Sequence, residues 1–504
     1  MAIVPLPSLP ASGACLSSEA VSALARGRRL YVVANRGPVH FHLREGRLEP
    51  RPAAGGLVTA LSSVADRVPL TWIAAAMGAG DRAAEGSRRT SKAAPGSPRV
   101  RYVVAPEEAL NWFYRRFANP ILWFLQHGMW HLLRRPDLTR MVEGGWMLGY
   151  RPVNEAFAKV VLQEVSRAER PAVLVQDYHL YLLPDTLRRR VPEMLLQHFT
   201  HIPWPGPEAW EPLHPFIRRE LCRGLLGADV AGFQTESSVL NFLHCCERFV
   251  PHSRVDYVRG TVQVGARRTA VRAYPISIDP QELRRIAGSP EASRYRQQIR
   301  SRLCRKTIVR VDRLDPSKNV ALGFRAFGSL LERRPDLAGQ VRFLAFLVPS
   351  RQSIAEYRRY AQEVWREVEA VNSRFGRDGW QPIEVFHEDN RVQAVAGMAL
   401  ADVLLVNSMA DGMNLVAKEA PMVSEKDEVL VLSERCGAHR QLGHASLTVK
   451  PTDLDGTASA LERALEMGQQ ERRHRGRMLR RAIEAEDLSW WVGRQLEDLM
   501  ESAR

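Results

Sequence analysis

The chain is 504 residues long and 45% hydrophobic. Because a single hydrophobic core stops growing near about 250–300 residues, this length predicts two large domains. The formal net charge is +15, from 71 basic and 56 acidic residues, yet the arginines are scattered in pairs rather than gathered in one tail or stripe. This scattered distribution argues against nucleic-acid binding. A basic surface of this kind also suits a phosphorylated small substrate.

The cysteines and the apolar runs narrow the class of protein further. The six cysteines have no C-x-x-C metal spacing, and the adjacent pair Cys245-Cys246 is expected in a buried helix rather than in a disulfide framework. The N-terminus lacks a basic segment followed by an apolar one, and no apolar run reaches the ~18–20 residues that span a bilayer. We therefore expect a soluble, cytoplasmic protein with no membrane partner.

Short apolar runs alternate with longer helical ones from Leu30 onward, after an arm rich in Pro, Ser and Ala. Such alternation predicts parallel sheets, which bind ligands at the carboxyl ends of their strands. The stretch Gly78–Val100 is expected to be a loop, and Leu488–Met500 an amphipathic helix that docks on the rest of the chain. Strands are predicted at Leu30–Ala34, Ala172–Gln176, Leu195–Thr200, Val230–Phe233, Thr307–Val311, Val341–Leu347, Ile383–Phe386, Val403–Val406, Glu428–Leu432 and Ser446–Val449.

Polar residues follow several of the predicted strands in the first half of the chain. Arg36 comes directly after the first strand, and the pair Gly55-Gly56 begins a later helical run, where backbone can approach a phosphate closely. Asp177 and His201 each end a strand, and a carboxylate and an imidazole there can bond sugar hydroxyls. The run from Tyr114 to His127 mixes aromatic and polar residues at helical spacing, which is also typical of a core helix.

Two cations follow the predicted strand Thr307–Val311 in the second half. Arg313 and Lys318 can together neutralise a diphosphate and stabilise the charge that grows on it as a leaving group. A solvated pair of loop residues is the competing interpretation of this motif.

The run from Asp411 to Glu419 is the most informative in the chain. It follows the apolar strand Val403–Val406 and places a glycine and several backbone N–H groups at an expected helix N-terminus, which can hold an anion. Glu419 is expected two turns further along that helix. A strand, a turn and a helix with these residues also occur in many α/β proteins without such a role.

Together these runs resemble the retaining trehalose-6-phosphate synthase family, and the resemblance covers nearly everything from Leu30 to Leu496. The runs that carry it, in order, are Asn35-Arg36, Gly55-Gly56, Tyr114 to Trp123, Tyr150-x-x-Val153-Asn154, Asp177-Tyr178-His179, His201-Ile202-Pro203, Gly232-Phe233-Gln234-Thr235, Arg313-Leu314-Asp315-x-Ser317-Lys318, Pro349-Ser350-Arg351 and Asp411 to Glu419.

The resemblance implies the GT-B architecture, an α/β fold in which two Rossmann-like domains with parallel sheets face a central cleft. It implies a loose arm at 1–28, an N-terminal acceptor-binding domain at 29–275, a C-terminal nucleotide-sugar-binding domain at 276–484 and a helix at 485–504 returning to the first domain. The implied reaction transfers glucose from a nucleoside diphosphate glucose, UDP- or GDP-glucose, to glucose 6-phosphate, giving trehalose 6-phosphate with retained α configuration. Neither a metal nor a cofactor is implied.

Roles for individual residues follow from the same resemblance. The catalytic residues would be Arg313, Lys318, His201 and Asp411. The donor would be bound by Gly56, Arg313, Lys318, Asp411, Gly412, Met413, Asn414, Leu415, Val416 and Glu419. The acceptor would be bound by Arg36, Tyr114, Trp123, Asp177 and Arg351.

Some positions depart from the family pattern, and they concern the acceptor more than the donor. Where many relatives read W-x-G-W, this chain reads Trp72-Ile73-Ala74-Ala75, and Pro316 and Asn319 flank Ser317-Lys318 in place of the usual tyrosine and glycine. Asn319 and Glu419-Ala420-Pro421 also resemble pseudo-glycosyltransferases that couple cyclitols. A relative that uses glycerol 3-phosphate or an aminocyclitol phosphate is therefore the nearest alternative.

Alternatives of other classes are a catalytically silent sugar-phosphate sensor and a nucleic-acid-binding protein. A protein that senses only the acceptor has no need of a complete binding site for the donor diphosphate, such as the one that Arg313, Lys318, Asp411 and Glu419 would form. We expect the two sugar substrates as partners, no nucleic acid, and a possible homo-oligomer. The sequence does not choose the donor base.

Overall fold

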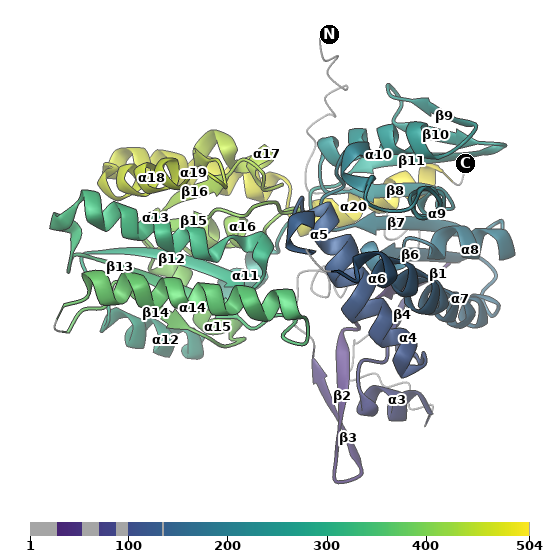
Figure 1. Ribbon diagram of the computed structural model, residues 1–504, viewed down its shortest axis with the longest axis horizontal. Coiled ribbons are helices and arrows are strands. Elements are labelled where there is room, and N and C mark those ends of the chain that lie inside the picture. The colour runs from purple at the N-terminus through teal and green to yellow at the C-terminus, as the bar shows by residue number, and fades with distance from the viewer. Residues whose placement is uncertain (1–27, 53–69, 87–98, 134–135, 378, 503–504) are drawn as a thin grey trace. The chain divides into compact units, whose positions relative to one another are not determined.

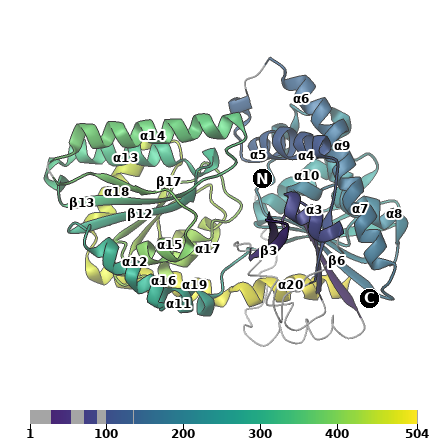
Figure 2. The same cartoon turned by 90° about the horizontal axis from the view of Figure 1, so that it is seen from below.

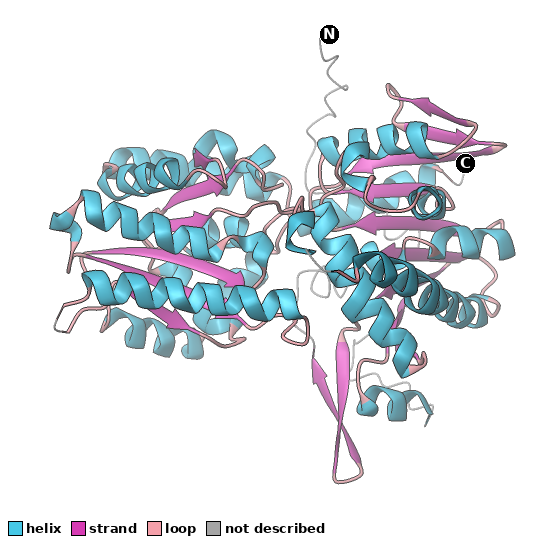
Figure 3. Ribbon diagram, in the orientation of Figure 1, coloured by secondary structure: helices cyan, strands magenta, loops and turns pink. Residues whose placement is uncertain are grey.

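The computed structural model of the protein describes residues 28–52, 70–86, 99–133, 136–377 and 379–502. The predicted N-terminal arm up to residue 27 and the Gly55-Gly56 pair lie outside these residues. The chain divides into two compact units, one formed by Met1–Pro275 and Leu488–Arg504 and the other by Ile276–Asp487. Both units are α/β, with parallel strands covered by helices (Figures 1 and 3).

The first unit is built on a nine-stranded sheet in the order β5-β4-β1-β6-β7-β8-β11-β10-β9. Its strands are parallel except for β10 and β9, which extend one edge as antiparallel strands. A separate antiparallel hairpin pairs β2 with β3. The strands of this unit are β1 (Arg29–Ala34), β2 (Val39–Arg44), β3 (Arg47–Pro52), β4 (Leu70–Ala75), β5 (Arg99–Val103), β6 (Pro171–Gln176), β7 (Leu195–Thr200), β8 (Val230–Phe233), β9 (Ser253–Asp256), β10 (Thr261–Val264) and β11 (Arg267–Ala273).

The helices of the first unit include two π-helical segments, Trp112–Leu122 and Gly145–Tyr150, that pack against each other. Among its α-helices, α20 returns from the end of the chain to pack on β7 and β8. These α-helices are α3 (Ala79–Gly86), α4 (Glu107–Asn111), α5 (Trp123–Gln126), α6 (Leu138–Gly144), α7 (Arg151–Val165), α8 (Leu183–Arg190), α9 (Pro215–Leu225), α10 (Glu236–Phe249) and α20 (Leu488–Glu501).

The second unit contains a six-stranded, fully parallel sheet in the order β14-β13-β12-β15-β16-β17. Its strands are β12 (Lys306–Arg313), β13 (Val341–Val348), β14 (Ile383–Phe386), β15 (Val403–Val406), β16 (Val429–Ser433) and β17 (Leu447–Val449). Its helices are α11 (Pro280–Ala287), α12 (Pro290–Arg300), α13 (Val320–Arg333), α14 (Ala355–Phe375), α15 (Arg391–Ala399), α16 (Val416–Val423), α17 (His439–Leu442), α18 (Leu454–Glu466) and α19 (Gln469–Ala485).

Continuous apolar runs explain why this second sheet is covered on both faces. All four residues of β15 and all five of β16 are buried, as expected of parallel strands sandwiched between helices. Figure 2 shows α13 and α14 on one side of the sheet and α11, α12 and α15 on the other. One core cluster joins strand residues such as Ile308 and Phe343 to Phe324 and Phe327 of α13 and Leu461 of α18.

The ten predicted strands are confirmed, and each pairs in parallel with its neighbours in the sheet. The prediction of Cys245-Cys246 in a buried helix is also confirmed, since both lie buried in α10. The docking helix is confirmed as α20, where Trp491 is fully buried and its Nε1 donates to the Tyr274 carbonyl (3.1 Å). Within the described ranges, no helix combines the length and apolarity needed to cross a membrane.

The loop expected over Gly78–Val100 is wrong at both ends, because α3 and β5 occupy its described parts. The small residues there serve close packing: a Cβ on Gly80 would lie 2.0 Å from the Phe41 carbonyl oxygen. Asp81 is buried, and its carboxylate accepts from the backbone N–H groups of Phe41 (2.8 Å) and Met77 (2.9 Å). The helix is thereby fixed to the β2–β3 hairpin.

Candidate active site

The sheet of the second unit brings the segments of Arg313 and Asp411 together, at the carboxyl ends of neighbouring strands. Taken in chain order, its strands run 3-2-1-4-5-6, so the direction of winding reverses between β12 and β15. In open parallel sheets, ligands bind at the carboxyl ends of the strands on either side of such a reversal. Arg313 ends β12, where it is exposed, and Asp411 follows β15.

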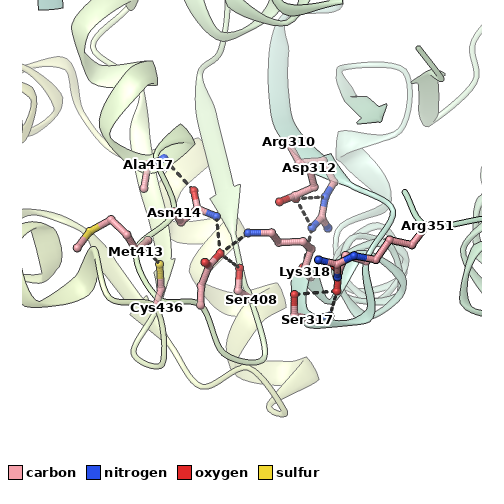
Figure 4. Close-up of polar contacts among 12 residues, drawn as sticks. Arg310, Asp312, Ser317, Lys318, Arg351, Ser408, Met413, Asn414, Ala417 and Cys436 are labelled. Atoms are coloured by element: carbon pink, nitrogen blue, oxygen red, sulfur yellow. Dashed lines mark hydrogen bonds and ion pairs between the residues drawn. The ribbon is translucent and has the colours of Figure 1, made fainter. Parts of the chain in front are cut away.

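Lys318 and Asp411 form an ion pair at this point (Figure 4). Their side chains are only 13% and 14% exposed. The Asp411 carboxylate also accepts from Ser408 Oγ (3.4 Å) and Asn414 Nδ2 (3.2 Å). Burial by itself would lower the pKa of Lys318, but the charges of Asp411 and Asp312 outweigh it, so the pKa is raised and the ammonium stays charged.

Asp315 organises the turn that carries Lys318, and sequence reasoning assigned it no role. This fully buried carboxylate accepts from the N–H (3.0 Å) and the Oγ (2.9 Å) of Ser317 through Oδ1. Its Oδ2 accepts from Arg351 Nη1 (3.2 Å), and Arg351 also donates to the Tyr357 hydroxyl. Arg351, predicted to bind the acceptor, thus lies in the second unit, attached to the turn of Lys318.

The loop from Asp411 to Leu415 is held by its own side chains and by the loop after β16. Asn414 has a φ of 81°, and its Oδ1 accepts from the Ala417 N–H (3.1 Å). Gly437 lies so close that an added Cβ would be 1.8 Å from the Gly412 carbonyl oxygen, and its N–H donates to the Asp411 carbonyl (3.0 Å). The sequence offered no motif for this second loop beyond its single glycine.

Glu419 lies in the first turn of α16, because the helix begins only at Val416. The expectation that it lies two turns along the helix is therefore wrong, and the reason is the turn made by Asn414. Burial raises the pKa of the Glu419 carboxyl, and Arg391, whose Nη2 is 3.6 Å from Glu419 Oε1, acts in the opposite direction. The Glu419 side chain is 16% exposed, and a partly exposed carboxylate near a helix N-terminus can accept hydrogen bonds from a hydroxyl-bearing ligand.

The sheet of the first unit has the same reversal, between β1 and β6. Arg36 follows β1, and its Nη2 donates to the Tyr114 hydroxyl (3.2 Å). The Trp72 indole donates to the Arg36 carbonyl (3.1 Å), and the Tyr114 ring stacks on His179 at 6.2 Å between centroids. Two residues predicted to bind the acceptor are therefore in direct contact.

Asp177, at the end of β6, has φ 72° and ψ 169°. This region of backbone space is populated almost only by glycine, and holding another residue there costs about 1–3 kcal/mol. Its Oδ1 accepts from the His201 N–H (3.1 Å), and its own N–H donates to the Phe199 carbonyl (2.7 Å). Strain held in place by such bonds is typical of functional sites.

The His201 ring is held between two glutamines. Its Nε2 lies 3.0 Å from Gln176 Oε1, and its Nδ1 lies 3.5 Å from Gln234 Nε2. Burial lowers the pKa of His201 to about 3, so the imidazole is neutral near pH 7. The two partners favour the tautomer in which Nε2 carries the proton and donates to Gln176, while Nδ1 accepts a hydrogen bond from Gln234.

Trp123 differs from the other predicted acceptor residues because it is 95% buried, with 5% of its surface exposed. Its ring stacks on His127 at 4.2 Å between centroids and lies 5.6 Å from the Tyr178 ring. The structure thus brings together Arg36 with Tyr114, and Asp177 with His201, and it buries Trp123 in the core beside the Asp177-Tyr178-His179 segment.

Each unit has a Rossmann-like sheet with polar residues at its reversal point, and the solved structures that match the chain have this two-domain GT-B fold of glycosyltransferases. The family model of glycosyltransferase family 20 matches residues 28–501. The chain belongs to this family, that of the retaining trehalose-6-phosphate synthases.

Individual relatives agree with the family model. The chain is 35% identical to the trehalose-6-phosphate synthase of Mycolicibacterium gilvum over 93% of both chains. A Burkholderia xenovorans α,α-trehalose-phosphate synthase in complex with glucose-6-phosphate has a TM-score of 0.80 and 28% identity, covering 94% of this chain and 100% of that one. An E. coli structure bound with UDP-2-fluoro glucose also has a TM-score of 0.80 and 28% identity, over 94% and 98%.

Proposed function

We propose that this protein is an α,α-trehalose-phosphate synthase, which transfers glucose from a nucleoside diphosphate glucose to glucose 6-phosphate and yields trehalose 6-phosphate. The observation that carries the proposal is the Lys318–Asp411 ion pair beside Arg313 at the reversal point of the second sheet. It offers cations for a diphosphate and a carboxylate for a sugar hydroxyl in one place. Its relatives from M. gilvum and B. xenovorans support the same activity.

The donor contacts follow from this geometry. Arg313 and the charged Lys318 bind the diphosphate and stabilise the negative charge that develops on it as the bond to the anomeric carbon breaks. Asp411 accepts from a hydroxyl of the transferred glucose. The donor contacts assigned to residues 412–416 are made by their backbone groups, and Gly56 is proposed to contact the donor as well. Glu419 accepts from the ribose hydroxyls.

The transfer step needs no covalent intermediate. The acceptor's anomeric oxygen bonds to the glucose carbon on the face that the diphosphate leaves, and the departing diphosphate takes the hydroxyl proton. His201, whose imidazole is neutral, contacts the transferred sugar. No described side chain is assigned the role of nucleophile.

The acceptor sugar is oriented by Asp177, and its phosphate is met by Arg36, Tyr114, Trp123 and Arg351. In support, Arg36 already donates to Tyr114, which fixes the guanidinium beside a second hydrogen-bonding group. We assign acceptor binding mainly to a domain at 29–275 and donor binding to one at 276–484, with 485–504 as the returning helix.

We also propose that the protein acts in the cytoplasm, without nucleic acid or membrane partners, and that it can form a homo-oligomer. Five cysteines of the described chain are free thiols, which suits a reducing compartment.

A donor-by-acceptor matrix tests the function. Purified protein is given UDP-, GDP- or ADP-glucose with glucose 6-phosphate, glycerol 3-phosphate or an aminocyclitol phosphate, and release of the nucleoside diphosphate is measured. We expect release with glucose 6-phosphate and a disaccharide phosphate as product. Release only with another acceptor would favour the alternative transferase, and no release by folded protein with any pair would favour a silent sensor.

A further inference from the structure

Arg310 is a fully buried cation inside β12, shortly before Arg313 in the same strand. Arginine is almost never fully buried unless it is paired, because its guanidinium loses its hydration. Nothing in the sequence marked this residue, since it stands in an otherwise apolar strand where a hydrophobic side chain would fit the pattern.

Hydrogen bonds to a carboxylate and to backbone carbonyls replace the hydration that the buried guanidinium loses. Its Nε (3.1 Å) and Nη2 (2.7 Å) donate to Asp312 Oδ2, forming an ion pair within the strand. Nη2 also donates to the Lys318 carbonyl (3.1 Å) and Nη1 to the Val320 carbonyl (3.2 Å). Figure 4 shows Arg310 and Asp312 beside Lys318.

The two carbonyls lie on either side of Asn319, which links a short 3₁₀ turn to helix α13. Lys318 ends the short 3₁₀ turn Pro316–Lys318, and Val320 is the first residue of α13. Asn319 between them has a left-handed φ of 56°. Arg310 therefore joins the backbone before Asn319 to the backbone after it, and one of its bonds is to Lys318 itself, whose ammonium pairs with Asp411.

Helix α13 leaves room for this arrangement. A Cβ on Gly323 would lie 2.4 Å from Arg310 Nη1, so any larger residue would displace the guanidinium. The ring of Phe324 lies 5.7 Å from the guanidinium carbon and closes the other side. The space around Arg310 is thus shaped by two residues of the helix that the 3₁₀ turn precedes.

Asp312 links the pair to the charge of the site. It is buried, and burial raises the pKa of its carboxyl while Arg310 acts to lower it. Its negative charge adds to that of Asp411 in favouring the ammonium form of Lys318. Arg310 thus bonds both to the backbone of Lys318 and to Asp312, the carboxylate whose charge favours the Lys318 ammonium.

We infer that Arg310 is a positioning residue of the donor site: through the carbonyls of Lys318 and Val320 and through Asp312, it holds the Lys318 ammonium where the donor's diphosphate binds. The inference rests on the proposed function, because it takes Lys318 as a diphosphate contact. Arg310 itself touches no substrate.

The test compares Arg310→Lys with Arg472→Lys. Arg472 is a matched control, since it is 97% buried in the same unit and also donates to backbone carbonyls, those of Met467, Asp402 and Ala464. The readouts are the thermal midpoint, UDP and GDP affinity by calorimetry, and separate kcat and KM values for donor and acceptor. A double variant, Arg310→Met with Asp312→Asn, keeps the charge balanced and serves if Arg310→Lys does not fold.

We expect Arg310→Lys to lower donor kcat/KM and nucleoside diphosphate affinity about 10- to 100-fold, with the acceptor KM changed less than about threefold. Arg472→Lys should lower the thermal midpoint without this donor effect. Equal donor losses in the two variants, or none in the Arg310 variants, would overturn the inference while leaving the proposed function standing. A wild-type chain that binds no nucleoside diphosphate would overturn the proposed function, and the inference with it.

Discussion

The buried amine of Lys418 makes the stability of the second unit depend on pH. Lys418 lies in α16 with no exposed surface, and its Nζ donates to the Ile276 carbonyl (2.8 Å). Burial lowers the pKa of its ammonium to about 7; Glu486 and Cys436 act against this shift and Arg440 acts with it. We predict that Lys418→Met changes how the free energy of unfolding varies with pH.

The size of the effect follows from the pKa difference. The pKa falls from 10.5 to about 7, and one pKa unit corresponds to about 1.4 kcal/mol, so burying the ammonium costs about 5 kcal/mol below pH 7. Between pH 7 and 10.5 the unfolded chain binds the proton and the folded chain does not, so stability rises with pH. Over pH 6.5 to 9.5 the folded wild type should gain about 3 kcal/mol that the variant lacks.

The variant also loses the bond to the Ile276 carbonyl, which costs about 1–3 kcal/mol at every pH. Lys418→Met should therefore be the more stable chain at pH 6.5 and should lose that advantage by pH 9.5. Urea unfolding followed by tryptophan fluorescence at several pH values measures the difference. Lys159→Met, at an exposed lysine of α7, controls for the loss of one lysine. If the wild type and Lys418→Met change in parallel with pH, the buried-amine reasoning is refuted.

Three further predictions concern the proposed site. Arg313→Ala should lower kcat about 10²–10³-fold while the thermal midpoint stays near that of wild type, because Arg313 is exposed and acts on the leaving diphosphate; an unchanged kcat in the nucleoside diphosphate release assay would count against its role. Asp177→Gly should be about 1–3 kcal/mol more stable than Asp177→Ala, since both remove the carboxylate that accepts from the His201 N–H and only glycine adopts φ 72° and ψ 169° without strain, while both variants lose activity; equal stabilities in denaturant unfolding would contradict the strain argument. Tyr114→Phe removes the acceptor of the Arg36 bond and should raise the acceptor KM about 5- to 10-fold with little change in donor KM, as initial-rate kinetics would measure; an effect on the donor alone would be the wrong outcome.

Much of the architecture was readable from local patterns. Strands such as β6 and β15 are continuous apolar runs, and a parallel strand buried on both faces needs no information from distant residues to be recognised. The hairpin of β2 and β3 was missed although its turn, Glu45-Gly46, has positive φ at both residues and a glycine in second place. Strands β9 and β11 were missed because charged residues interrupt their apolar pattern, and β9 lies at the sheet edge, where such residues are tolerated.

What the sequence by itself determined was the fold class, the family and the segments that follow the central strands, because each rests on residues close together in the chain. Only the tertiary structure decided which individual charged side chains are buried. Arg310 and Lys418 are charged residues that the sequence would leave at a surface, and they are buried because partners from other elements meet them: the Lys318 and Val320 carbonyls in one case and the Ile276 carbonyl in the other. A charge enters a core only when bonds replace its water, and those bonds come from parts of the chain that folding alone brings together.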